Sequence, residues 1–186
     1  MAKKGVFCIE GEWSKSFSHQ DSVRPLVEFL TAGDDLRPAI YRRAASADAF
    51  IWYLGRWLET THYDIGFLTF HGTKGKIELG RDVVSLNELA DLLSGKCEGR
   101  HILLSCCQTL KVTKEELAEL RVVSKARSVS GYTKSPDFVE GSAFDLMVLT
   151  RLLYHDRPAR AEEWLQKNCA GLVQNYGFVM DYRTRR

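Results

Sequence analysis

Long hydrophobic runs are missing from this sequence. No apolar stretch approaches the roughly 18 residues that a membrane-spanning helix needs, so we expect no membrane partner. The N-terminal residues 1–4 lead straight into a short apolar run, with no small-residue cleavage site after it. We therefore expect no signal peptide and favour a cytoplasmic location.

An excess of charge of one sign is also missing. The 26 Lys and Arg side chains nearly balance 24 Asp and Glu side chains, which leaves a net charge of +2. A charge this small gives no electrostatic reason to expect a nucleic-acid partner. Residues 183–186 are locally basic, and we interpret them as a frayed tail rather than as a phosphate-binding arm.

Paired cysteines at regular spacing are missing, which argues against two kinds of site. The five cysteines form an odd set without any C-x-x-C pair, which argues against a disulfide framework and fits a reducing cytosol. Cys106 and Cys107 are neighbours and would point to opposite faces of a strand, so we expect no zinc or other metal site. The cysteines are Cys8, Cys97, Cys106, Cys107 and Cys169.

Nucleotide-binding loops are absent as well. No G-x-G-x-x-G or Walker-type loop follows a strand-like run. The glycine- and lysine-rich segment 72–76 leads into an expected hairpin rather than into a helix N-terminus, where a phosphate would bind. We therefore expect no cofactor.

Strand-like and helix-like segments alternate along the whole chain. This order predicts an α/β fold, a three-layer α/β/α sandwich with a mainly parallel central sheet. A chain of 186 residues without a long linker predicts one domain over residues 1–186. Strands are expected at 5–10, 39–44, 65–70, 101–105, 126–132 and 178–182, a hairpin at 72–80, and helices at 22–30, 47–60, 85–93, 117–120, 138–154 and 162–173.

Two of the expected strands end at chemically reactive residues. Residues 65–70 are followed by His71-Gly72, and residues 101–105 are followed by Cys106-Cys107. Parallel strands bring their carboxyl ends to one edge of a sheet, so an imidazole and a thiol meet there. A histidine that simply ends a strand, or a cysteine that fills the core, would explain each residue alone. Taken together they favour a Cys-His nucleophile pair, although alternation along a strand lets only one of the two thiols face the site.

These motifs resemble a known group of enzymes. A strand ending in His-Gly, a helix, and a strand ending in Leu-Ser-x-Cys-x-Thr resemble the CHAT branch of the caspase-like cysteine peptidases of clan CD, the relatives of caspases and separase. The resemblance extends over the order of strands and helices from Gly5 to about Leu153. It implies a caspase-like fold, with His71 as general base and Cys107 as nucleophile, in preference to Cys106. It also implies an oxyanion hole made by the backbone N–H groups of Gly72 and Cys107.

The sequence also departs from the pattern of caspases. The separation between His71 and Cys107 is 36 residues (107 − 71), shorter than the roughly 50 residues of caspases. The Gln-Ala-Cys-x-Gly signature and a long processed linker are absent, which speaks against activation by cleavage. No acidic third member of the site is assigned, because Asp64 precedes its strand and is expected at the opposite edge of the sheet.

Three acidic residues are candidates for substrate binding. Glu10 and Glu12 follow the first strand at the expected active edge, and Asp137 lies in a loop near it. A carboxylate there would favour Arg or Lys before the cleaved bond. The alternative interpretations are two solvated glutamates and, for Asp137, the N-cap of the helix that follows.

The sequence thus predicts a cysteine endopeptidase that hydrolyses peptide bonds of a specific protein target. The resemblance implies an effector that a separate activator or regulatory protein switches on, in some relatives as part of antiviral defence in bacteria. The alternative is a catalytically inactive caspase-like interaction module.

Overall fold

The computed structural model describes residues 4–14, 16, 21–33, 35–155 and 157–183. Residues 1–3, which precede the first strand, and residues 184–186 of the expected basic tail lie outside these ranges.

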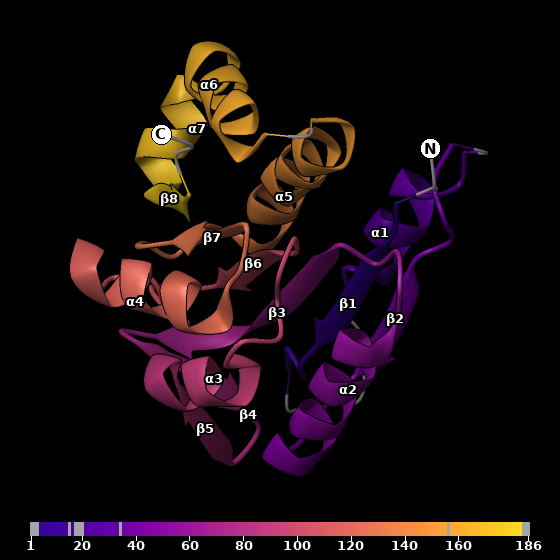
Figure 1. The fold of residues 1–186 in the computed structure, drawn as a ribbon, viewed down its shortest axis with the longest axis vertical. Helices are drawn as coiled ribbons and strands as arrows, with labels where there is room; N and C mark the ends of the chain where they lie inside the picture. The colour runs from indigo at the N-terminus through magenta and orange to yellow at the C-terminus, as the bar shows by residue number, and fades with distance from the viewer. Residues whose placement is uncertain (1–3, 15, 17–20, 34, 156, 184–186) are drawn as a thin grey trace.

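Strands and helices alternate along the described chain, as the sequence predicts (Figure 1). The strands are β1 (Val6–Glu10), β2 (Ile40–Arg43), β3 (Ile65–Thr73), β4 (Lys76–Leu79), β5 (Asp82–Ser85), β6 (His101–Cys106), β7 (Ser128–Tyr132) and β8 (Phe178–Tyr182). The helices are α1 (Arg24–Leu30), α2 (Ala47–Glu59), α3 (Leu86–Leu93), α4 (Lys114–Ser124), α5 (Phe138–Tyr154), α6 (Pro158–Asn168) and α7 (Ala170–Tyr176).

The central sheet is mainly parallel. Its strands follow the order β2-β1-β3-β6-β7-β8, and only the β7–β8 pair at one edge is antiparallel. The β4 and β5 strands form a separate antiparallel ladder on the end of β3. The expected α/β sandwich is therefore confirmed.

Helices cover both faces of this sheet and bury a separate core on each. One core joins the sheet to α2, α3 and α4, and the other joins it to α1, α5, α6 and α7. Figure 1 shows these two helical layers below and above the sheet. The side chains of alternate residues in each strand enter opposite cores.

Local signals in the sequence mark the starts of two helices, although the helix expected at 117–120 spans Lys114–Ser124. The Ser85 and Thr113 side chains form capping boxes with Glu88 and Glu116, which satisfy the free N–H groups at the starts of α3 and α4. The start expected for the first helix, residue 22, is wrong, because Val23 is the N-cap and the helix begins at Arg24.

Pro158 occupies the first position of α6. Proline suits that position because a helix leaves its first N–H groups without partners inside the helix. The single expected helix 162–173 is in fact the pair α6 and α7, which Cys169 separates.

The sequence expectation for the end of β3 needs one correction. The strand does not stop at His71 but runs on to Thr73. Its pairing with β1 and β6 ends near Phe70, and residues 71–73 then pair with β4 in an antiparallel hairpin. His71 and Gly72 are therefore held by backbone pairing and do not begin a loop.

Gly66 lets β3 approach the helix that covers it. A Cβ atom at this position would lie 2.6 Å from the indole ring of Trp57 on α2, which is completely buried. Only glycine leaves room for that ring, so the packing of α2 against β3 depends on this residue.

We predict that Gly66→Ala lowers the free energy of unfolding by about 1–3 kcal/mol, since overpacking a filled core typically costs that much. Gly55→Ala is the matched control, because its added methyl group meets nothing within 4 Å. On a helix this change should stabilise by roughly 0.5–1 kcal/mol. Urea denaturation of both variants measures the effects, and equal effects would contradict the role of Gly66.

Candidate active site

His71 and Cys107 lie on neighbouring strands at the same edge of the sheet. The parallel register of β3 and β6 ends with Phe70 opposite Cys106, so His71 and Cys107 are the next residues along the two chains. The His71 side chain is exposed and Cys107 is half-buried. Phe70 and Cys106 enter the core beneath α2, α3 and α4, so the residue after Phe70 points toward the opposite face.

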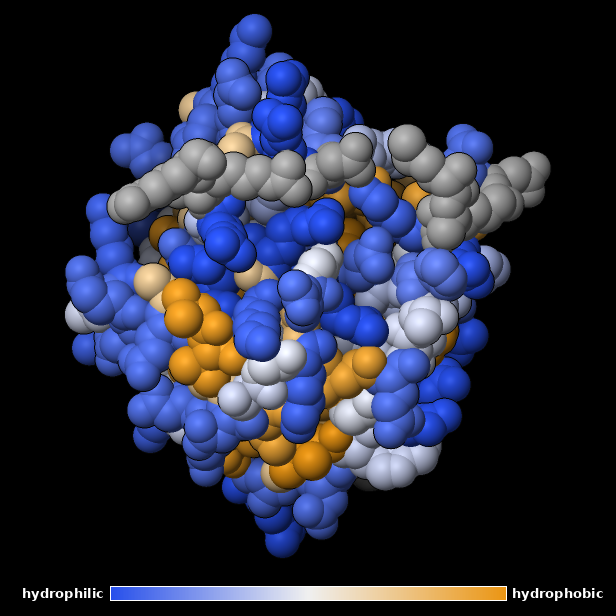
Figure 2. Space-filling view, in the orientation of Figure 1, coloured by the Kyte–Doolittle hydropathy of each residue, from blue (hydrophilic) through white to orange (hydrophobic). Residues whose placement is uncertain are grey.

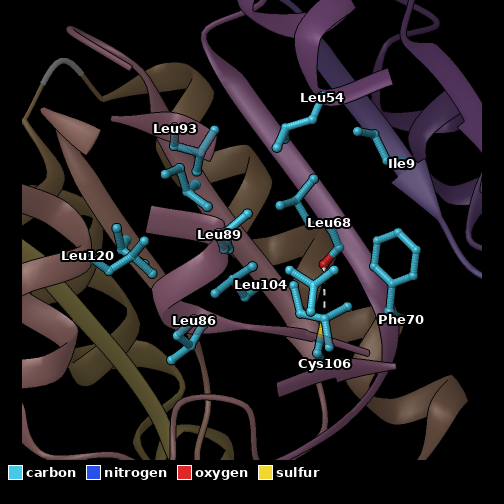
Figure 3. Packing of buried hydrophobic residues seen from close by; sticks show 14 of the residues in the cluster. Ile9, Leu54, Leu68, Phe70, Leu86, Leu89, Leu93, Leu104, Cys106 and Leu120 are labelled. Atoms are coloured by element: carbon cyan, nitrogen blue, oxygen red, sulfur yellow. Dashed lines mark hydrogen bonds between the residues drawn. The ribbon is translucent and has the colours of Figure 1, made fainter. Parts of the chain in front are cut away.

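Cys106 is a core residue. Its side chain is 1% exposed, and its thiol donates to the Leu68 carbonyl oxygen across 3.6 Å. Figure 3 shows this contact among the leucine side chains of the core. Burial raises the pKa of Cys106 well above its ordinary value, which keeps the sulfur in its unreactive thiol form. Of the two neighbouring cysteines, only Cys107 is partly exposed.

A backbone carbonyl group orients the His71 ring. The Nε2 atom of His71 lies 2.9 Å from the carbonyl oxygen of Trp13. A carbonyl oxygen only accepts hydrogen bonds, so this contact requires the proton on Nε2 and leaves Nδ1 as an acceptor. In many such sites an acidic side chain fixes the tautomer in this way. Here a main-chain oxygen does so, which sequence reasoning missed because a main-chain acceptor leaves no side-chain signal.

The Trp13 ring packs beside the same imidazole. Its centroid lies 5.1 Å from the His71 ring and 5.1 Å from the ring of Phe138, both in edge-on contacts. Phe138 is the first residue of α5. The indole therefore bridges the end of β3 and the start of α5.

Glu10 anchors the segment that carries Trp13. Its side chain is fully buried and accepts hydrogen bonds from the Trp13 indole N–H at 2.6 Å and the Ser22 hydroxyl at 2.6 Å. It also accepts from the Val23 backbone N–H at 2.7 Å and from the Tyr41 hydroxyl. The residue stands at the end of β1, as expected. Its carboxylate faces inward, however, so its burial gives no support to the predicted contact with substrate.

The other two acidic candidates remain at the surface. Glu12 pairs with Arg43 at 3.2 Å, and both side chains are partly exposed. Asp137 caps α5 by accepting from the Val139 and Glu140 backbone N–H groups at 2.9 and 3.3 Å. The N-cap interpretation of Asp137 is therefore confirmed, while substrate binding by either residue stays a prediction.

Gly72 sits where no larger residue fits. A Cβ atom on it would lie 2.2 Å from Oγ1 of Thr109 and 2.9 Å from the carbonyl oxygen of Cys107. The backbones of β3 and of the segment after β6 therefore touch at this point. The Thr109 hydroxyl holds the segment by donating to the Lys76 carbonyl oxygen at 3.0 Å.

The pairing of β3 sets the direction of the Gly72 N–H group. The Asp64 carbonyl accepts from His101 at the start of β6, and the Thr69 carbonyl accepts from Gly11 beyond β1. Even-numbered residues of β3 thus turn their backbone groups toward β6. By this alternation the N–H group of Gly72 lies on the side of β3 that faces the Cys107 segment. The roles of the Gly72 and Cys107 N–H groups as oxyanion donors stay predictions.

A buried carboxyl group that the sequence analysis did not assign lies beneath this edge. Asp145 on α5 accepts hydrogen bonds from the hydroxyls of Ser105 and Tyr132, both at 2.5 Å. Ser105 precedes Cys107 by two residues, so it belongs to the same face of β6. Burial raises the pKa of Asp145 to about 7, although the two hydrogen bonds oppose the shift. The signal in the sequence was an acid within the apolar stripe of a helix.

Three further observations bound the chemistry of the site. All five cysteines are free. Within the described ranges, no three His, Cys, Asp or Glu side chains come together as metal ligands. In the same part of the chain, no helix combines the length and the apolar character that crossing a membrane requires.

Comparisons with known proteins match the chain to one family and one fold. The DUF6642 family, described as a family of unknown function, matches residues 3–182. The crystal structure of caspase-1 from Spodoptera frugiperda is similar to this fold, with a TM-score of 0.54 and 13% sequence identity. The match covers 82% of this chain and 69% of that one, which shows a caspase-like fold. No curated protein matches the sequence.

We predict that Glu10→Ala lowers the free energy of unfolding by about 3 kcal/mol or more, because buried donors left without an acceptor each cost roughly 1–3 kcal/mol. Glu12→Ala is the matched control, and its effect should stay within about 0.5 kcal/mol, as is usual at the surface. Urea denaturation measures both values. Similar values for the two variants would show that Glu10 does not anchor the Trp13 segment.

We predict that Asp145 makes the fold less stable as the pH rises. An unfolded aspartate titrates near 3.9, so the folded protein binds more protons than the unfolded chain between about pH 4 and pH 7. The contribution of Asp145 to the free energy of unfolding is therefore fully present below about pH 4. It is lost as the pH rises from about 4 to about 7. Asp145→Asn should remove this pH dependence. As the pH is raised from about 5 to about 8, the free energy of unfolding of the variant should increase by roughly 1–3 kcal/mol relative to that of the parent protein.

Urea denaturation at both pH values measures this difference, with Glu12→Gln as the surface control. Parallel pH dependences of the parent protein and the Asp145 variant would refute the assignment.

Proposed function

The chain belongs to the DUF6642 family of unknown function, and we propose that it is a cysteine peptidase with a His71–Cys107 dyad. The proposal rests on two residues that stand one position beyond Phe70 and Cys106, the last register pair of β3 and β6: the partly exposed Cys107 and His71, whose imidazole is oriented. The caspase-like fold supports it, because cysteine peptidases use this architecture.

The contact between His71 and Trp13 supports a role of His71 as general base. With the proton held on Nε2 by the Trp13 carbonyl, Nδ1 is the atom that takes the proton of the Cys107 thiol. The thiolate then attacks the carbonyl carbon of the substrate peptide, and the oxyanion that forms accepts a hydrogen bond from the Gly72 N–H. When the C–N bond breaks, Nδ1 returns the proton to the leaving amine.

The thioester left on Cys107 is then hydrolysed. A water molecule gives a proton to Nδ1 and attacks the thioester carbon, which releases the carboxylic acid and restores the thiol. Each step uses groups that this chain supplies, together with water and the peptide. The chemistry needs no metal or cofactor.

The finer assignment follows the resemblance to the CHAT branch of clan CD. It makes the substrate a specific protein and the enzyme a partner-activated effector, acting in the cytoplasm and in bacterial antiviral defence. An exposed Glu12 is consistent with a preference for Arg or Lys before the cleaved bond. The competing function is an interaction module that keeps the fold without using the dyad. The edge-on packing of Trp13 against His71 favours this alternative, since it restricts one side of the imidazole.

We predict that a peptidyl acyloxymethyl ketone labels the protein at Cys107 alone. Cys107→Ala should abolish labelling, and His71→Ala should slow it at least a hundredfold, the lower range for loss of a general base. Cys106→Ala is the matched control and should keep labelling if it folds, which circular dichroism checks. Intact-protein mass spectrometry follows the adduct. Unchanged labelling of the Cys107 variant would leave only the interaction module.

A further inference from the structure

A hollow between α3 and α4 has no part in the proposed chemistry. Its volume is about 190 Å³, and the turn of the β3–β4 hairpin closes one end of it at Gly75. Figure 2, in the orientation of Figure 1, shows apolar residues gathered on the face where α3 and α4 lie. The floor of the hollow, which we call the α3–α4 groove, is made by Leu86, Ala90, Val112, Leu120 and Val123.

The rim of the α3–α4 groove is acidic. Asp91, Glu116 and Glu119 line it, and no basic residue does. The backbone N–H and hydroxyl of Thr113 lower the pKa of Glu116, so this carboxylate stays ionised. Lys74 stands near enough to lower that pKa further but does not line the groove. These carboxylates give the groove a negative rim, although the protein as a whole carries a net charge of +2.

We propose that the α3–α4 groove binds a basic amphipathic segment of a partner protein. The apolar floor takes one or two aliphatic side chains, and the acidic rim pairs with Lys or Arg on the flanks of the segment. At about 190 Å³ the groove falls below the roughly 300 Å³ at which small-molecule sites begin. Its size therefore fits side chains of a macromolecule rather than a free metabolite.

Gly75 connects the α3–α4 groove to the candidate active site. Its N–H donates to the Thr109 carbonyl oxygen at 3.1 Å, and its carbonyl accepts from the Leu86 N–H at 2.9 Å. Thr109 in turn contacts both the Gly72 position and the Cys107 carbonyl, which lies 3.4 Å from the Thr109 hydroxyl. A segment seated against Gly75 and α3 thus acts on the backbone that holds Gly72 and Cys107. This coupling rests on the proposed function, whereas the docking itself does not.

The docking is tested with a fluorescein-labelled helical peptide of leucine and lysine, by fluorescence anisotropy at low ionic strength. The full chain should bind it with micromolar affinity, and a glutamate-for-lysine peptide should not bind. The double variant Asp91→Asn/Glu119→Gln should weaken binding about tenfold, because two rim charges are lost. Ala90→Gln, which fills the groove without changing its charge, should also weaken it.

Glu115→Gln is the matched control, since Glu115 is an exposed acid on α4 that does not line the groove. Equal weakening by this control would overturn the proposal in favour of general charge attraction. Analytical ultracentrifugation tests whether a second copy of the chain occupies the groove. A homodimer that dissociates in the double variant would assign the groove to that second copy and would also overturn the proposal.

The coupling has its own readout. The peptide should raise the rate of Cys107 labelling by the ketone at least threefold in the parent protein and not in the double variant. Binding that leaves the labelling rate unchanged overturns the coupling and leaves the docking site in place. A protein that binds the peptide but never reacts with the ketone contradicts the proposed function instead.

Discussion

The contact between Gly72 and the segment after β6 is the constraint on which the candidate site depends. The two backbones meet so closely that a single methyl group at position 72 would collide with Thr109 and with the Cys107 carbonyl. The contact forms because β3 continues past the parallel sheet and exchanges its partner β1 for β4. An ordinary strand end would release His71 into a loop. Here the hairpin fixes the backbone of His71 and Gly72 beside the segment that carries Cys107.

Two buried carboxyl groups support this edge from one face of the sheet. Glu10 and Thr69 are register partners, and so are Thr69 and Ser105, whose hydroxyl binds Asp145. A polar row therefore crosses β1, β3 and β6 one step below the dyad, where apolar packing would otherwise continue. Such groups are costly to bury unless they are hydrogen-bonded, and Glu10 is saturated with donors. The fold sustains this arrangement because the apolar cores on either side are extensive.

The sequence predicted those features that local patterns encode. The alternation of elements, the capping boxes at Ser85 and Thr113, and the order of His71 and Cys107 all lie within short stretches of chain. Contacts between distant segments were not predictable in this way. The extension of β3 depends on pairing with β4, and the burial of Cys106 rather than Cys107 depends on which face of β6 meets α3 and α4.

The acid at position 145 was open to detection, since it shares a helical stripe with Val148, Leu149 and Leu152 and so had to be buried. The inward turn of the Glu10 side chain was not, because its four donors come from the chain after β1 and from β2. The local sequence does not distinguish a carboxylate that faces solvent at the end of a strand from one that faces the interior.

The group that orients His71 is a main-chain carbonyl oxygen, so no amino-acid substitution removes it. Every amino acid at position 13 carries the same oxygen, so a scan of side-chain replacements reports on the indole and on the shape of the turn but never on the acceptor itself. Chemical synthesis reaches it: exchanging the amide bond between Trp13 and Ser14 for an ester weakens that oxygen as an acceptor and leaves every side chain untouched. The tautomer of the His71 imidazole is therefore fixed by the path of the main chain and not by the side chain at position 13.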